Sequence, residues 1–124
     1  MHLMRIAEVV WLSIAGGAVP AYAEGDSARG RLAYRRCCIA CHGDSKTASS
    51  AGPSLVGLIG RRAGTVAGAH YRRSLYESGI IWDEAALRRY LASPSDEVHG
   101  TIMPVGVHDP VERDDLVAYL KSLK

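Results

Sequence analysis

Hydrophobic residues recur at helical spacing in three stretches of the chain. The first is predicted to run from an N-cap at Asp26 to the neighbourhood of Cys41. The second begins after an N-cap at Asp83 and stops at Ser93-Pro94, because a proline disfavours helical backbone in the residue before it. The apolar positions of these two helices are Leu32 with Tyr34, and Leu87 with Leu91.

The third stretch opens at Asp109-Pro110, with proline at the first helical position and Glu112 placed to complete a capping box with Asp109. Its apolar residues fall on one helical face, with Val117 and Tyr119 alongside: Leu116, Leu120 and Leu123. This is the most regular helical pattern in the chain.

Long loops connect the predicted helices. Ser, Thr and Gly dominate from Gly43 to Pro53, and the segment that follows is punctuated by glycines without the alternation of a strand: Gly57, Gly60, Gly64 and Gly68. The predicted fold class is therefore all-α, with three main helices, short helical turns and long loops. Such a set cannot close a core alone, and we expect a ligand at its centre.

Composition narrows the function classes. The chain has 124 residues, 48% of them hydrophobic, which fits one folded domain, while the aromatic share of 6% is low for building a core. A formal net charge of +2 does not indicate a nucleic-acid binder, whose affinity requires clustered phosphate contacts. Three cysteines are too few, and odd in number, for a disulfide-stapled scaffold.

Residues 1–23 are predicted to be a cleaved secretory signal. An apolar stretch from Val9 to Val19 precedes Ala21-Tyr22-Ala23, which has small residues at the positions that a signal peptidase recognises. The alternative is a membrane anchor, but this stretch is much shorter than the ~20 residues needed to span a bilayer. We expect one domain over residues 24–124, exported to the periplasm and without a membrane span after cleavage.

The segment from Cys38 to His42 has the sequence C-x-x-C-H, which is typical of covalent haem c attachment. On one helical turn, Cys38 and Cys41 reach the two vinyl groups of one porphyrin, and His42 binds the iron as proximal ligand. A thioredoxin-like redox pair would require a preceding strand, which the pattern does not predict. A zinc site would require two more ligands at suitable spacing.

The chain resembles the class I c-type cytochromes, particularly the soluble bacterial forms close to the mitochondrial one. The resemblance covers residues 25–124 and rests on motifs that follow in order: Gly30 and Tyr34, C-x-x-C-H-G at 38–43, Gly52-Pro53-Ser54-Leu55, Gly60-Arg61-Arg62-Ala63-Gly64, Tyr71, Gly79-Ile80-Ile81-Trp82, Tyr90-Leu91 with Pro94, Gly100-Thr101-Ile102-Met103, and the segment from Glu112 to Leu120. It implies a small cytochrome c fold wrapped around one covalently bound haem.

Met103 is the candidate sixth ligand. Met1 and Met4 lie in the predicted signal, so Met103 is the one thioether expected in the mature chain, in a loop bounded by Gly100 and Pro104. An isolated methionine is more often a core-filling residue, but the upstream motif and the family's G-T-x-M pattern favour a ligand. The competing residues are His70, His99 and His108, which we expect at the surface.

The resemblance also implies roles around the haem. The carbonyl of Pro53 would accept the ring N–H of His42, and Tyr90 would lie near the axial sulfur. Gly30 would mark the crossing of the first and last helices beside Tyr119. Four residues match positions that hold the haem propionates: Arg61, Tyr71, Trp82 and Thr101.

Three features depart from the family. Cys37 immediately precedes Cys38, and Val105 replaces the aromatic residue expected two positions after the ligand methionine. The basic ring that docks mitochondrial cytochrome c on its oxidase is largely missing, since its positions here read Cys37, Ser95, Asp96 and Ile102. Most of the basic doublets elsewhere, at residues 35–36, 61–62, 72–73 and 88–89, are interpreted as solvated surface.

The sequence therefore predicts a monomeric, periplasmic one-electron carrier of a respiratory chain, not an enzyme. Its expected partners are redox proteins: a membrane cytochrome complex, an oxidase or reductase, or a periplasmic dehydrogenase. Two alternatives stay open. In the first, the chain is a dedicated electron-transfer subunit of a periplasmic dehydrogenase. In the second, it is a haem enzyme or gas binder in which the bond from Met103 to the iron is labile.

Overall fold

The computed structural model describes residues 16–17, 24–44 and 51–124. Six helices occur in this part: α1 (Ser27–Cys37), α2 (Ile39–His42), α3 (Arg73–Glu77), α4 (Glu84–Ala92), α5 (Pro94–Glu97) and α6 (Pro110–Ser122). The described residues form no strand, only one isolated antiparallel bridge between Arg62 and Ile81. The all-α prediction is confirmed, whereas most of the predicted signal segment lies outside the described residues.

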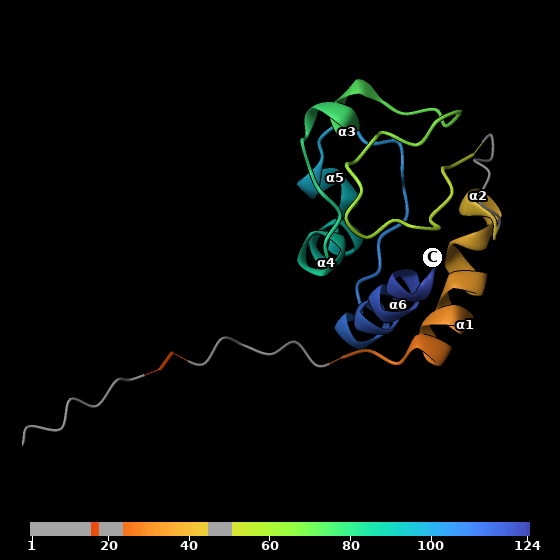
Figure 1. Ribbon diagram of the computed structural model, residues 1–124, viewed down its shortest axis with the longest axis vertical. Helices are drawn as coiled ribbons and strands as arrows, with labels where there is room; N and C mark the ends of the chain where they lie inside the picture. Colours follow the sequence, from red (N-terminus) through yellow and green to blue (C-terminus); the bar gives the residue numbers. More distant parts are fainter. Residues whose placement is uncertain (1–15, 18–23, 45–50) are drawn as a thin grey trace, which may run out of the picture.

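The packing of α1 against α6 brings the two ends of the domain together (Figure 1). Gly30 makes the crossing close, because a Cβ there would overlap the carbonyl oxygen of Asp115 and lie 2.8 Å from Tyr119 Cβ. The rings of Tyr34 and Tyr119 lie 5.3 Å apart between centroids. The buried carboxylate of Asp115 accepts from Asp26 N at 2.6 Å and from Arg29 Nε at 2.8 Å, which anchors the start of α1.

Two helix predictions are accurate and one needs correction. Asp83 caps α4 and Asp109 caps α6 through side-chain hydrogen bonds. The first helix is interrupted at Cys38, which caps the end of α1 with φ −117° and ψ −38°, and the chain continues to His42 as the single turn of α2. The predicted capping box is also wrong, since the Glu112 carboxylate pairs with Arg36 of α1 instead of the Asp109 backbone.

The loop between α2 and α3 is held by backbone hydrogen bonds to the segment before α4. Gly60 N donates to Trp82 O at 2.7 Å, and Trp82 N donates to Arg61 O at 2.9 Å. These bonds fix Arg61 and Trp82 relative to one another. In the described part of the chain, no helix is long and apolar enough to cross a membrane.

Candidate functional site

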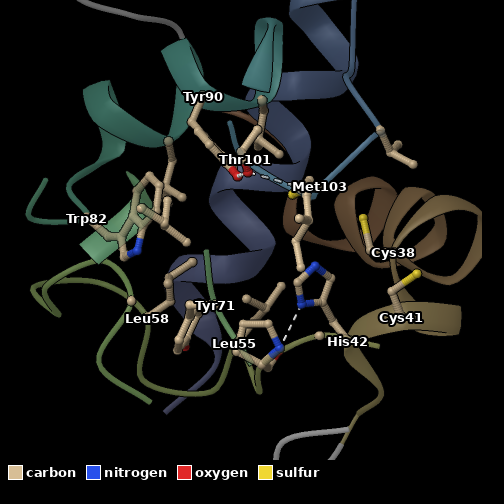
Figure 2. A pocket seen from close by; sticks show the side chains of 18 of the residues that line it. Cys38, Cys41, His42, Leu55, Leu58, Tyr71, Trp82, Tyr90, Thr101 and Met103 are labelled. Carbon is tan, nitrogen blue, oxygen red and sulfur yellow. Dashed lines mark hydrogen bonds between the residues drawn. The ribbon is translucent and has the colours of Figure 1, made fainter. Parts of the chain in front are cut away.

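An apolar cavity lies between α2, α4, α6 and the loops that join them (Figure 2). All ten residues that the sequence analysis assigned to the site line it: Cys38, Cys41, His42, Pro53, Arg61, Tyr71, Trp82, Tyr90, Thr101 and Met103. The walls between them include seven leucines, among them Leu58, Leu116 and Leu120, which are buried. These ten predicted residues are spread over more than 60 positions of the sequence, from Cys38 to Met103, and the fold brings them to one cavity.

His42 ends α2 and is held in one ring orientation. Its Nδ1 lies 2.8 Å from Pro53 O, so Nδ1 carries the proton and Nε2 is left with a free lone pair (Figure 2). Gly52 packs against the same ring, and a Cβ there would lie 3.1 Å from Nδ1. Burial lowers the pKa of His42, against the opposing effect of the Pro53 hydrogen bond, and so favours the neutral ring that can bind a metal.

The three cysteines lie at the junction of α1 and α2. Cys38 Sγ is 3.5 Å from Cys37 Sγ, and Cys37 Sγ donates to Ala33 O at 3.0 Å. Burial, followed by the neighbouring Cys37, raises the pKa of the Cys38 thiol to about 12. All three line the cavity, so position alone does not select the pair. Cys38 and Cys41 share a single turn, in which Cys41 N and His42 N both donate to Cys38 O.

Met103 projects into the cavity from the loop between α5 and α6 (Figure 2). Thr101 organises this loop, because its Oγ1 lies 2.6 Å from the Tyr90 hydroxyl and accepts from Met103 N at 3.4 Å. Ile102 and Val105 on either side are exposed. The thioether is therefore held inside the cavity while its neighbours in the loop face solvent.

The polar lining residues are fixed by different partners. Arg61 donates to Ser54 O at 2.9 Å and to Val56 O at 3.1 Å, and burial lowers its pKa. The Tyr71 hydroxyl accepts from Val66 N at 3.2 Å. The ring of Trp82 meets Tyr90 edge-on at 5.1 Å between centroids.

Among the competing histidines, only His70 lines the cavity; His99 and His108 are exposed away from it. Arg72 is exposed, as expected for the doublet at residues 72–73, but it also borders the cavity, which the sequence does not predict. The described residues contain no cluster of three or more His, Cys, Asp or Glu side chains that could hold a metal ion.

Known proteins share this arrangement. The cytochrome c family model matches residues 27–124. A cytochrome c2 of Rhodopila globiformis is 40% identical over 101 residues, covering 81% of this chain and 95% of the relative. A cytochrome c2 of Rhodomicrobium vannielii is 37% identical over 118 residues, covering 94% and 89% respectively.

Among solved structures, cytochrome cH from Methylobacterium extorquens superposes with a TM-score of 0.73 at 40% identity, covering 79% of this chain and 99% of that one. The match extends over the helices and loops that form the cavity. This chain therefore belongs to the cytochrome c family, whose members are electron carriers with one covalently attached haem c.

Proposed function

We propose that the protein is a periplasmic one-electron carrier whose haem is attached through Cys38 and Cys41 and whose iron is bound by His42 and Met103. The observation that carries this proposal is the pairing of His42 Nδ1 with Pro53 O, which leaves Nε2 free in a cavity that also receives the Met103 side chain. One imidazole nitrogen and one thioether are the ligand pair that raises the reduction potential of a haem.

The residues present fit this cofactor. The lining is apolar over most of its area, as the faces of a porphyrin require, while Arg61, Tyr71 and Trp82 supply polar groups for its carboxylates. When bound, haem c supplies a one-electron ferric/ferrous couple. The chain's own residues keep water out through Leu58, Leu116 and Leu120 and hold both axial donors in place, which limits reorganisation during electron transfer.

We propose further that residues 1–23 direct export and that electrons pass at the edge near Cys41. Cys41 is exposed although it lines the cavity, and Ile102 and Val105 are 55% and 37% exposed in the neighbouring loop. A redox partner docked there would reach the cofactor over a short distance. Both axial ligands stay bound during such electron transfer, so no substrate reacts at the iron.

A redox titration of the holoprotein from the periplasmic fraction, followed by optical spectra, tests the proposal. We expect a reversible one-electron transition, a six-coordinate reduced spectrum and a sulfur-to-iron charge-transfer band at neutral pH. Met103→Ala should abolish this band and lower the potential, because a thioether stabilises ferrous iron. An unchanged spectrum in this variant would refute the ligand assignment, and the absence of holoprotein from the periplasm would refute export.

A further inference from the structure

Two arginines line the cavity, and neither meets a carboxylate of the described residues. They are Arg61, whose side chain is bound to backbone carbonyls, and Arg72, which has no side-chain hydrogen bond or ion pair within residues 24–44 and 51–124. Other arginines of the same part of the chain are ion-paired: Arg29, Arg36, Arg73, Arg88 and Arg89. Four further arginines of the described residues also lack a carboxylate partner, but none of them lines the cavity: Arg31, Arg35, Arg62 and Arg113. Arg61 and Arg72 are therefore the two described arginines placed to meet the charge of a ligand in the cavity.

The backbone at the start of α3 separates Arg72 from Arg73. Arg72 precedes the helix in extended geometry, with φ −74° and ψ 144°, next to Tyr71, and both residues line the cavity. Arg73 begins α3, its side chain is 87% exposed, and it pairs with Glu77 at 3.3 Å. Both arginines are exposed, but Arg72 also lines the cavity, whereas Arg73 does not line it and pairs with Glu77.

The polar groups that the family resemblance assigns to the haem propionates are partly committed elsewhere. Two nitrogens of Arg61 donate to Ser54 O and Val56 O. The hydroxyl of Thr101 is bound to Tyr90 and to Met103 N. A haem c brings two carboxylates, and a cavity with one partly engaged cation would leave their charge poorly balanced.

We propose that Arg72 is a second guanidinium that binds a haem carboxylate, an inference that rests on the haem site proposed above. Its side chain has five N–H donors in a planar fork, which matches a carboxylate with two parallel hydrogen bonds. Bound there, Arg72 neutralises a propionate and raises the electrostatic potential at the iron. Arg72 thus positions the haem and favours its reduced state.

The test compares adjacent arginines in the purified holoprotein. Arg72→Gln should lower the equilibrium constant for reduction by roughly two- to fivefold, because it removes a positive charge whose effect on the iron is weakened by distance and solvent. Arg73→Gln is the matched control and should leave the constant unchanged, because its charge is exposed and already paired with Glu77. Arg72→Lys should restore most of the loss, since it returns the charge without the fork.

The outcomes separate this inference from the proposed function. If Arg72→Gln and Arg73→Gln change the equilibrium constant for reduction equally, or if Arg72→Gln does not change it, the role of Arg72 is overturned. In either case the spectrum that reports His42 and Met103 as axial ligands remains unchanged. Failure of the unsubstituted chain to attach haem, or a spectrum without the sulfur-to-iron band, would instead overturn the haem site itself. A lower reduction constant in Arg72→Gln alone, with an unchanged axial-ligand spectrum, supports the assignment.

Discussion

Adjacent cysteines pose the main question at the scale of single residues. Cys37 and Cys38 both line the cavity with their sulfurs 3.5 Å apart, yet they belong to different local structures. Cys37 is the last residue of α1 and binds Ala33 O, whereas Cys38 begins the turn that carries Cys41 and His42. We therefore propose that the two thioethers form at Cys38 and Cys41, which share this turn.

Alanine substitution of each cysteine tests this choice. Cys37→Ala should leave two thioethers, because the Cys38–Cys41 turn is unaltered. Cys38→Ala should give a single thioether or no holoprotein. The position of the pyridine haemochrome band, together with the mass of the haem-bound protein, distinguishes one thioether from two. The reverse pattern would show that attachment uses Cys37.

Gly30 determines packing at the scale of elements, because α1 and α6 touch where it has no side chain. Gly30→Ala should destabilise the fold by about 1–3 kcal/mol or more, since the added Cβ would overlap the Asp115 carbonyl and force the helices apart. Arg31→Ala, on an exposed position of the same helix, is the control for helix propensity. Equal free energies of unfolding for the two variants in urea would contradict a close crossing.

The carboxylate of Asp115 gives the same crossing a dependence on pH. Its hydrogen bond with Arg29, and then the one from Asp26 N, lower the pKa of Asp115 below its unfolded value of about 3.9. The stabilisation is therefore complete above the unfolded pKa and is lost as pH falls through the folded pKa. Asp115→Asn should be less stable than the natural chain at pH 7, and the difference should narrow toward pH 3. A difference in unfolding free energy that stays constant from pH 7 to pH 3 would exclude this linkage.

The elements that sequence predicted well are those with local signals. Asp83 and Asp109 cap their helices as predicted, because the aspartate side chain itself accepts a hydrogen bond from a backbone N–H of the first turn. The break at Cys38 and the short helices α3 and α5 have no such signal, since each depends on packing with distant segments. Glu112 illustrates the same limit: its local partner was predicted from spacing, but Arg36 of another helix takes it.

The site shows a similar division between residues with and without a motif. The predicted site residues that belong to recognisable motifs, from Cys38 to Met103, line the cavity. The contact of Arg72 with the cavity is not predictable from the sequence, because a basic doublet carries no information about which of its two exposed members borders a cavity. Only the extended backbone before α3 separates it from Arg73.

The whole molecule is built around its cavity more than around a continuous core. The main helix contacts are α1 with α6 and α4 with α6, so one end of the domain is held by helices and the other mostly by loops. Leucines from both ends line the space between, including Leu58, Leu87 and Leu116. These three are buried, whereas Leu55, Leu75 and Met103, which also line the space, are only partly buried, and a bound ligand would complete their burial.

Without haem, the domain should therefore lose cooperative folding. In a Cys38→Ser/Cys41→Ser variant purified free of haem, we expect far-UV circular dichroism with reduced helicity and a broad thermal transition, because the apolar lining is left in contact with water. Added haem binds only the folded state, so it should restore helicity, and the helicity should increase with haem concentration. Arg31→Ala, which leaves both cysteines in place, controls for substitution itself. A sharp transition in the haem-free variant, at the temperature of the holoprotein, would mean that helices α1, α4 and α6 sustain the fold alone and that the cavity is not its organising centre.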